Sequence, residues 1–198
     1  GSVMTFGLNK ILIVFSSTAT AVFGVYFKLQ SFVFMPVFGL NNGMVPIVSY
    51  NFGAKRPERI ILAYKLSIVA AESIMLLGVL VFMLFPDQLL SLFSASDQMK
   101  EIGRVALRII SIHFMLAGFS IVTVSLFQAL GHGFVSMINS LIRQLVVLLP
   151  AAYVLSRFGL DAVWWAFPIA ELASVIVCSL YLKQVIRNDI DPLKEERV

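Results

Sequence analysis

Hydrophobic residues run along this chain in long stretches that only turn residues and a few charges interrupt. Residues 29–54 contain no Asp, Glu, Lys or Arg across 26 positions, and residues 109–142 contain none across 34. About 20 apolar residues let a helix cross the hydrocarbon core of a bilayer, so the second stretch exceeds one crossing. Gly131-His132-Gly133 divides it, because glycine adopts the positive φ angles of a tight turn. The pattern predicts membrane-spanning helices, the open-chain structure that satisfies every backbone group in lipid.

Proline and glycine mark the ends of these predicted spans. Gly53 suits a helix C-terminus, Pro57 a first helical turn, and Gly159 a break before the last span. The first apolar run, residues 3–15, is too short to cross a bilayer. Gly1-Ser2 is a cloning remnant, or the sequence starts inside a longer chain. We favour the second explanation and interpret the run as the second half of a span. The expected spans lie near residues 1–15 (partial), 20–52, 58–85, 103–130, 134–156 and 162–184, in one lobe of residues 1–187, followed by a tail of residues 188–198.

Lysine and arginine are unequally distributed between the two ends of this expected bundle. If the spans alternate in direction, eight of the 15 Lys and Arg residues lie at one end and five at the other, with Lys28 and Arg143 inside spans. Basic residues favour the cytoplasmic side of a membrane. The end that holds residues 51–59 and the tail is therefore predicted to face the cytoplasm.

Composition supports the membrane interpretation and excludes other classes. The chain is 59% hydrophobic and 13% charged, with a mean hydropathy of +0.92, whereas soluble domains have roughly 25% charged residues. Soluble and disordered chains are thereby excluded. The net charge of +4 is not gathered into the basic face that nucleic-acid binding needs, and a single cysteine, Cys178, permits no internal disulfide. The expected fold class is an all-α membrane protein.

One polar stripe follows the span near residues 20–52 at spacings of three and four. Polar and charged groups at membrane depth are costly and by default mark a cavity or pathway, so we interpret Lys28 and Asn42 as facing a polar cavity. Gly39 and Gly43 are better explained by close helix packing. The stripe comprises Lys28, Ser31, Met35, Gly39, Asn42, Pro46 and Ser49.

A second polar stripe lies on the span near residues 134–156, where Ser136, Asn139, Ser140 and Arg143 share a face. Arg143 lies roughly 15 Å from the start of this helix at 1.5 Å per residue, so we expect it to meet a carboxylate, carbonyl groups or water. His113, in the preceding span, is more readily a structural hydrogen-bonding residue than a proton relay.

Two acids, Glu72 and Glu171, lie near the middle of their spans. Each is a candidate for a proton or sodium site, and the alternative is a structural role, for example a pair between Glu171 and Arg143. We favour the structural role for Glu171 and leave Glu72 open. No two acids share a helix face within a span, so no dedicated metal cage is expected. Phosphate-binding glycine loops, GxSxG, HExxH and CxxC are all absent, which argues against an enzyme and against a bound cofactor.

The most distinctive stretch is residues 36–60, PVFGLNNGMVPIVSYNFGAKRPERI. It resembles the helix-and-loop signature of the multidrug and toxic compound extrusion (MATE) transporters, and YFKLQSFVFM at residues 26–35 resembles the MepA-like bacterial branch of that family. QALG at 128–131, SLIRQ at 140–144 with Pro150, and PIAE at 168–171 extend the resemblance over nearly the whole chain.

The resemblance implies a transporter of twelve spans in two six-helix lobes, of which this chain is similar to the C-terminal lobe with its first helix truncated. It implies export of cationic, amphipathic drugs across a prokaryotic plasma membrane in exchange for sodium or protons, by rocking of this lobe against an N-terminal six-helix lobe. Some branches carry a cation-binding aspartate on the helix that matches the fourth span. Here that helix has Phe119 and no acid between Glu101 and Asp161, so the ion site does not transfer to any residue.

The expected site residues come from the two stripes and the two acids. Met35 and the 17 phenylalanines would supply an adaptable apolar surface for varied drugs. Two alternatives stay open: a lipid-precursor flippase of the same superfamily, which Lys28 and Arg143 would suit, and a membrane fragment that does not transport. The substrate-cavity candidates are Lys28, Ser31, Met35, Asn42, Asn139 and Arg143, and the weaker ion-coupling candidates are Glu72 and Glu171.

Overall fold

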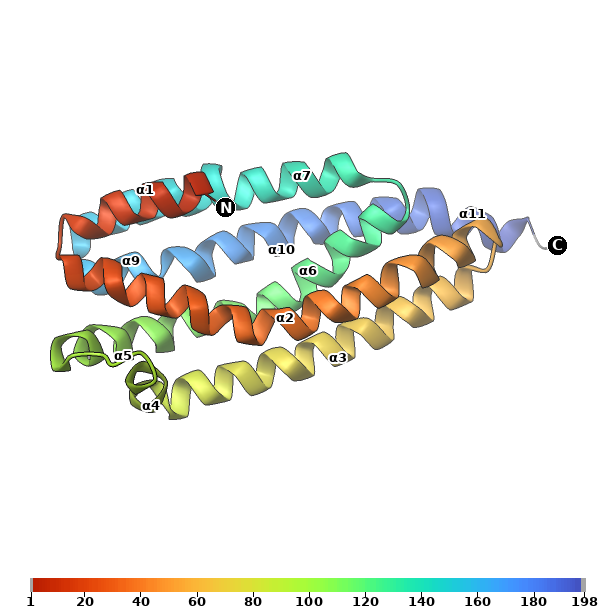
Figure 1. The fold of residues 1–198 in the computed structure, drawn as a ribbon. Helices are drawn as coiled ribbons and strands as arrows, with labels where there is room; N and C mark the ends of the chain where they lie inside the picture. Colours follow the sequence, from red (N-terminus) through yellow and green to blue (C-terminus); the bar gives the residue numbers. More distant parts are fainter. Residues whose placement is uncertain (1, 197–198) are drawn as a thin grey trace.

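The computed structural model describes residues 2–196, and these form helices joined by short turns, with no strand among them (Figure 1). Three long helices, α2 (Ser17–Gly53), α3 (Pro57–Leu84) and α10 (Ala166–Val185), run lengthwise through an elongated bundle. The other elements are α1 (Ser2–Ile13), α4 (Pro86–Ser91), α5 (Asp97–Ser111), α6 (His113–Ala129), α7 (Gly133–Leu141), a π-helix (Ile142–Leu148), α8 (Leu149–Leu155), a 3-10 turn (Ser156–Phe158), α9 (Leu160–Trp164), a second π-helix (Ile186–Ile190) and α11 (Asp191–Glu195).

Four helical segments are long and apolar enough to cross a membrane: Ser17–Gly53, Pro57–Leu84, Gly133–Phe158 and Leu160–Glu195. The pair α5 and α6 makes a fifth if it is one span, bent by 45°. The sequence predicted this span as residues 103–130 without a bend, whereas the helix pair begins at Asp97 and bends between α5 and α6. The helix begins at Asp97 because the side chain of Ser96 accepts a hydrogen bond from the backbone N–H of Met99, at 3.3 Å.

The segment expected as a tail is helical and held against the bundle over residues 188–196. Ile190 and Leu193 are buried, although charged residues surround them in the sequence. Two ion pairs connect the segment to the turns at this end of the molecule: Lys55 Nζ lies 2.5 Å from Glu196 Oε2, and His132 Nε2 lies 2.6 Å from Asp189 Oδ2. The last segment therefore links the α2–α3 turn to the α6–α7 turn.

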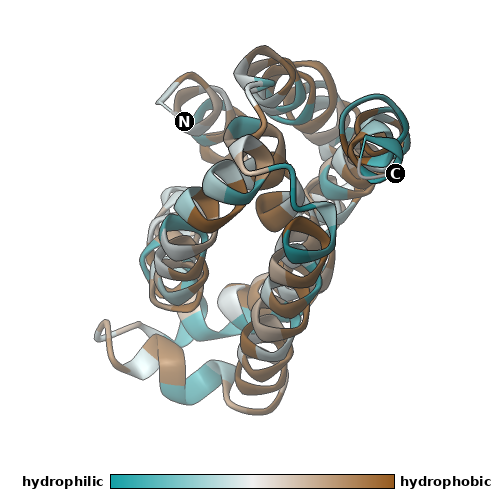
Figure 2. Cartoon of the chain, turned by 90° about the vertical axis from the view of Figure 1, so that its right-hand side faces the viewer, coloured by the Kyte–Doolittle hydropathy of each residue, from teal (hydrophilic) through white to brown (hydrophobic). Residues whose placement is uncertain are grey.

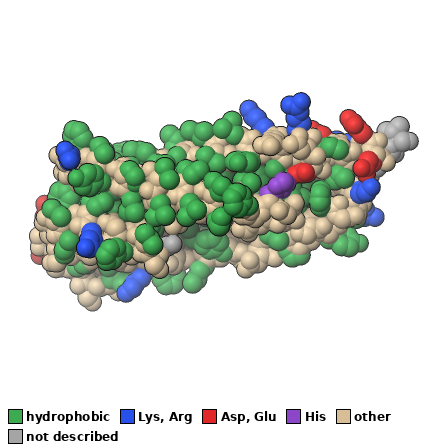
Figure 3. Space-filling view, turned by 90° about the horizontal axis from the view of Figure 1, so that it is seen from above, with side chains coloured by type: hydrophobic (Ala, Val, Ile, Leu, Met, Phe, Trp, Pro, Cys, Tyr) green, Lys and Arg blue, Asp and Glu red, His purple; other side chains and the backbone are tan. Residues whose placement is uncertain are grey.

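The outer surface carries the apolar side chains that a bilayer requires. On the face seen in Figure 3, charged side chains group toward the two ends and hydrophobic ones cover the stretch between. Viewed from the end that carries the C-terminus, hydrophilic residues gather at the turns and at the last segment (Figure 2). Phe32 on α2 and Leu66 on α3, 73% and 61% exposed, are two of the large apolar side chains that the bundle leaves uncovered. Water would oppose this exposure, and lipid favours it.

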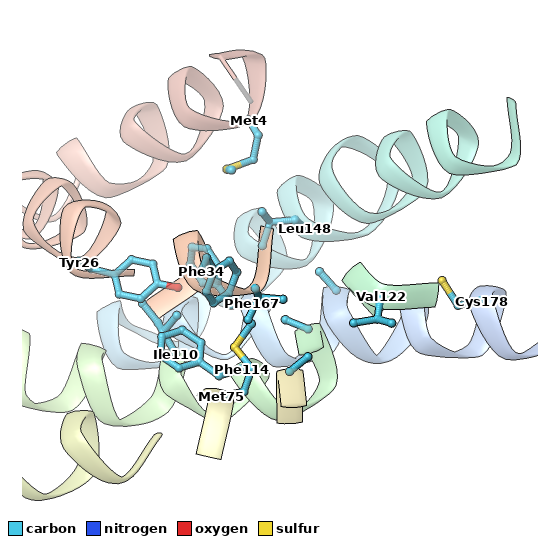
Figure 4. Close-up of a cluster of buried hydrophobic side chains, with 14 of the residues drawn as sticks. Met4, Tyr26, Phe34, Met75, Ile110, Phe114, Val122, Leu148, Phe167 and Cys178 are labelled. Atoms are coloured by element: carbon cyan, nitrogen blue, oxygen red, sulfur yellow. The ribbon is translucent and has the colours of Figure 1, made fainter. Parts of the chain in front are cut away.

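A buried aromatic cluster joins α2, α3, α6 and α10. The ring centroid of Phe114 on α6 lies 5.3 Å from that of Phe34 on α2 and 5.0 Å from that of Phe82 on α3. Both pairs are edge-to-face, an arrangement that the aromatic quadrupole favours. Figure 4 shows Met75 of α3 and Phe167 of α10 in the same cluster. This core fixes α2, α3, α6 and α10 relative to one another.

Glycine permits close helix contact at some positions and not at others. A Cβ on Gly78 would lie 2.6 Å from Cγ1 of Val33, so α2 and α3 approach closely there. A Cβ on Gly39 or Gly43 would meet no atom within 4 Å. The interpretation of Gly39 and Gly43 as packing residues is therefore wrong within this bundle, because their face of α2 is open.

We expect Gly78→Ala to lower the free energy of unfolding by about 1–3 kcal/mol, because the added methyl group forces Val33 out of its place. Gly43→Ala is the matched control: it makes the same change in open space and is expected to be neutral or slightly stabilising, since alanine favours helix. Thermal unfolding of both variants in detergent measures the difference. Equal stability of the two variants would contradict the close α2–α3 contact.

Candidate functional site

A cavity of about 640 Å³ lies among α2, α6, the helix of residues 133–148 and α10, with Met4 of α1 on its wall. Part of its wall is apolar, with Phe34, Phe38 and Phe167 among the lining side chains. The polar part comprises Gln30, Ser31, Asn41, Asn42, His113, Ser120, Ser125, Gln128, Asn139, Ser140, Arg143, Gln144 and Glu171.

Helix α2 supplies one side of the cavity from a single face. Its lining residues recur three or four positions apart, as in Phe34, Phe38 and Asn41, which is the spacing of one helix face. The amide nitrogen of Asn41 donates to the backbone carbonyl of Ile121 at 3.5 Å, which links α2 to α6 at the cavity wall. The other amide atom, Asn41 Oδ1, is buried without a hydrogen-bond partner.

Arg143 and Gln144 reach the cavity from the π-helix Ile142–Leu148. Pro150 lies just after this segment and has no N–H, so the carbonyl of Val146 loses its α-helical donor. The wider turns come directly before the proline, as expected where the hydrogen-bond ladder is interrupted. Such π-helical turns occur frequently at functional sites.

Two charged residues, Arg143 and Glu171, stand among the described residues that line the cavity, and they form an ion pair. Arg143 Nη1 lies 3.4 Å from Glu171 Oε2, longer than a strong charge-assisted hydrogen bond of about 2.7–2.9 Å. The Glu171 side chain is only 4% exposed, and its second oxygen, Oε1, is buried without a partner. The positive charge of Arg143 and the negative charge of Glu171 balance, and one of the two carboxylate oxygens has no hydrogen-bond partner.

Two further polar residues fix the helices that carry this pair. Asn139 Nδ2 donates to Ser174 Oγ at 3.0 Å, and the pair's return contact, Ser174 Oγ to Asn139 Oδ1, measures 3.3 Å. Because Asn139 is on α7 and Ser174 on α10, these contacts set the distance between the backbones that hold Arg143 and Glu171. Asn139 is 3% exposed and Ser174 fully buried.

His113 lies at the start of α6, between the aromatic rings of the wall. Its ring centroid is 6.0 Å from that of Phe34 and 5.9 Å from that of Phe167. Nδ1 lies 2.5 Å from the backbone carbonyl oxygen of Ile110. A carbonyl oxygen only accepts, so Nδ1 is the donor, and Nε2 is an acceptor when the ring is uncharged.

Five of the six substrate-cavity candidates line this one cavity: Ser31, Met35, Asn42, Asn139 and Arg143. Lys28 does not. It is exposed, and its Nζ lies 5.9 Å from the ring centroid of Phe93, in the segment after α4. Side chains on a helix point back toward its N-terminus, and a long lysine extends its charge toward water. The backbone position of Lys28 belongs to the polar stripe, but its side chain does not point into the cavity.

The two ion-coupling candidates are separated. Glu171 lines the cavity, whereas Glu72 lies at the contact between α3 and α6, where a Cβ on Gly118 would be 2.8 Å from its Oε1. Within residues 2–196, no three His, Cys, Asp or Glu side chains are grouped in a way that could hold a metal ion. The sequence did not single out Gln30, Asn41 or Gln144 as lining residues. Each of these residues directly adjoins a predicted lining residue in the sequence, and this adjacency could have identified it.

Comparisons with known proteins agree on one family. A family model described as MatE matches residues 2–154. The multidrug export protein MepA of Staphylococcus haemolyticus is 31% identical over 179 residues, which cover 87% of this chain and 39% of that protein. A MepA from Staphylococcus aureus is 26% identical, with 87% and 38% covered. The chain thus spans about two-fifths of the length of these curated relatives.

The fold gives the same result. A solved structure described as the outward-facing conformation of a multidrug resistance MATE family transporter of the MOP superfamily superposes with a TM-score of 0.88 at 28% identity. The superposition covers 98% of this chain and 44% of that chain. Nearly every residue of this chain has an equivalent in that transporter, whereas more than half of the transporter has no equivalent in this chain.

Proposed function

The chain belongs to the MATE family, whose members are transporters, and we propose that it is the C-terminal lobe of a secondary active exporter of cationic, amphipathic drugs. The transport path is completed by a second six-helix lobe, since the chain spans about two-fifths of the length of its curated relatives. The transporter resides in a prokaryotic plasma membrane with Lys55, His132 and the α11 segment on the cytoplasmic side.

The observation that carries the substrate class is the cavity itself. Its wall combines aromatic rings with one buried carboxylate whose second oxygen is unused. Rings attract organic cations through their π faces, and Met35 supplies a flexible, polarisable side chain that adapts to different shapes. An amphipathic cation would place its apolar body against Phe34, Phe38 and Phe167 and its charge toward Glu171.

The same carboxylate offers a site for coupling. In this proposal, inward sodium or protons compete with the drug for Glu171, the only acid among the residues that line the cavity. The ion and the drug displace each other from the carboxylate. Drug binding therefore accompanies the outward movement of the lobe, and ion binding accompanies its return. Pro36 and Pro46 lie within α2, where a missing backbone donor eases bending of the helix that faces the cavity.

Lipid-precursor flipping, the alternative from the same superfamily, fits this wall less well. A cavity that grips lipid phosphates needs unpaired basic residues. Here Arg143 is the only lysine or arginine among the lining residues, and Glu171 already pairs with it. Lys28, the other basic residue that supported this alternative, lies outside the cavity.

Reconstituted vesicles test the proposal. We expect ethidium efflux, driven by an imposed sodium or proton gradient, when the chain is joined to an N-terminal six-helix lobe, and none when the chain is alone, because one lobe encloses half of a path. Vesicles without protein and vesicles without a gradient are the controls. Gradient-driven efflux by the chain alone would overturn the single-lobe proposal, and no efflux by the joined protein would overturn the drug-export proposal.

A further inference from the structure

The helix pair α5–α6 bends by 45° at a place where neither proline nor glycine accounts for the bend. No proline occurs between Pro86 and Pro150, and the nearest glycines, Gly103 and Gly118, lie nine and six residues from Ile112 at the break. A sharp bend can also arise where a side chain takes a place in the backbone hydrogen-bond ladder. Two side chains at the break are positioned to do this.

Ser111 is the first of them. Its Oγ donates to the backbone carbonyl of Arg108 at 3.0 Å. In a continuous α-helix that carbonyl accepts the N–H of Ile112, four residues later. Here the N–H of Ile112 bonds the carbonyl of Ile109 instead, at 3.3 Å. The serine hydroxyl therefore competes with the ladder at the point where the ladder is interrupted.

His113 is the second, and it also belongs to the cavity wall. Its Nδ1 donates to the carbonyl of Ile110 at 2.5 Å, and a continuous helix would use that carbonyl for the N–H of Phe114. On the other side, the ring lies between Phe34 and Phe167, with centroid distances of 6.0 and 5.9 Å. One side chain thus touches both the break in the helix and the cavity.

The break separates a helix that is fixed to α4 from a helix that forms part of the wall. On α5, Arg104 makes two hydrogen bonds of 3.1 Å to the carboxylate of Asp87, and a Cβ on Gly103 would lie 2.7 Å from a methyl carbon of Leu90. A change of about 10° in the bend would move the far end of the 17-residue α6 by about 4 Å, at 1.5 Å per residue. Besides His113, α6 lines the cavity with Ser120, Ile121, Val124, Ser125 and Gln128.

We propose that His113 is a positioning residue for transport. Its hydrogen bond to the Ile110 carbonyl sets the bend between α5 and α6, and the bend determines where α6 places its part of the cavity wall. The inference rests on the proposed function, which assigns this wall to the drug path. The N–H donor carries the role, whereas the ring fills the space between Phe34 and Phe167.

Two substitutions separate the donor from the ring. His113→Phe keeps an aromatic ring of similar size and loses the donor. His113→Asn loses the ring and keeps an N–H donor, because the amide nitrogen of asparagine occupies the place of histidine Nδ1. Ser125→Ala is the matched control: Ser125 Oγ donates to the carbonyl of Ile121 at 3.0 Å, so it removes a side-chain-to-backbone hydrogen bond of the same kind within α6 and away from the break.

Spin labels at Glu101→Cys on α5 and Phe134→Cys just after α6 report the bend by double electron–electron resonance, in the full chain in lipid nanodiscs. Both positions are exposed, and the native Cys178 is fully buried. We expect His113→Phe to lengthen the separation of the labels by about 2–3 Å as the 45° bend opens, given 1.5 Å per helical residue. His113→Asn and Ser125→Ala should keep the distance of the parent protein.

Ethidium efflux by the two-lobed protein in vesicles tests the connection with transport. His113→Phe should lose most of the efflux at equal protein level, and His113→Asn, which keeps the bend and lacks the ring, should retain part of it. His113→Leu also lacks the donor and replaces His113→Phe if that variant does not fold.

The outcomes separate this inference from the proposed function. An unchanged label distance in His113→Phe, or equal lengthening in His113→Phe and His113→Asn, overturns the hydrogen bond as the cause of the bend. A longer distance together with normal efflux overturns the positioning role and leaves the drug-export proposal in place. If the unsubstituted two-lobed protein shows no efflux, the proposed function fails and the positioning role fails with it, whereas the label distances still decide what sets the bend.

Discussion

Phe114→Ala is expected to lower the free energy of unfolding by about 3–5 kcal/mol, the usual cost of removing a fully buried phenylalanine. The ring contacts Phe34, Phe82 and His113 at centroid distances of 5.3, 5.0 and 5.1 Å. Alanine would leave a cavity where α2, α3 and α6 meet, and rigid helices cannot collapse to fill it. Close packing of this kind is a main source of attraction between helices that lie in lipid, so its removal is felt directly.

Phe32→Ala is the matched control for this prediction. Phe32 is 73% exposed on α2, so its ring makes few contacts within this bundle and its removal should change stability by less than about 0.5 kcal/mol. Unfolding of both variants in detergent, followed by circular dichroism, measures the difference. A Phe114→Ala protein as stable as Phe32→Ala would show that the aromatic cluster does not hold the lobe together.

Much of this architecture follows from hydropathy alone. The gap between apolar runs at Gly131 and Gly133 corresponds to the turn between α6 and α7, and Pro57 begins α3. These features are local: a run of apolar residues in lipid has to be helical, and a turn needs residues that tolerate its backbone angles. The polar stripes of α2 and α7 could be predicted for the same reason, because polar residues three or four positions apart lie on one face of a helix.

Other features depend on distant parts of the chain and left no local signal. Lys28 belongs to the stripe by its position, but its long side chain extends to Phe93 after α4. Gly39 and Gly43 have the spacing of a packing motif, yet no helix of this bundle covers them. Ile190 and Leu193 lie among charges in the sequence, and only their docking beside the turns at Lys55 and His132 shows that they are buried.

The cavity shows the same division. Asn139 and Arg143 were identified from their helix face. The surroundings of Asn41 and His113, in contrast, depend on which of their polar atoms the fold engages. The carbonyls of Ile121 and Ile110 occupy one polar atom of each side chain, so the remaining atom is an acceptor. That assignment requires the partner helices to be in place. The π-helix that presents Arg143 likewise depends on how Pro150 interrupts a hydrogen-bond ladder.

Arg143→Ala is expected to reduce drug efflux at least about tenfold in a two-lobed transporter while the amount of protein in the membrane stays near normal. The change removes the positive charge that the described wall residues carry and leaves Glu171, 4% exposed, without its counter-ion. We expect the protein to keep its fold, because the Arg143 side chain is 28% exposed and not deeply buried. The carboxylate without its guanidinium partner no longer exchanges its ion for the drug. Efflux of ethidium and drug resistance of cells, each normalised to protein level, measure the effect.

Three companion variants distinguish charge balance from a role in transport. Arg157→Ala removes an exposed arginine that lies near Tyr153 and outside the cavity, so efflux should be unchanged. Arg143→Lys keeps the charge but loses the planar guanidinium, and partial efflux is expected. Arg143→Ala combined with Glu171→Gln leaves the wall neutral, so stability should match the parent protein while efflux stays low. Normal drug resistance in Arg143→Ala at normal protein levels would contradict the assignment, because the pair would then serve only to hold α10 against the neighbouring helix.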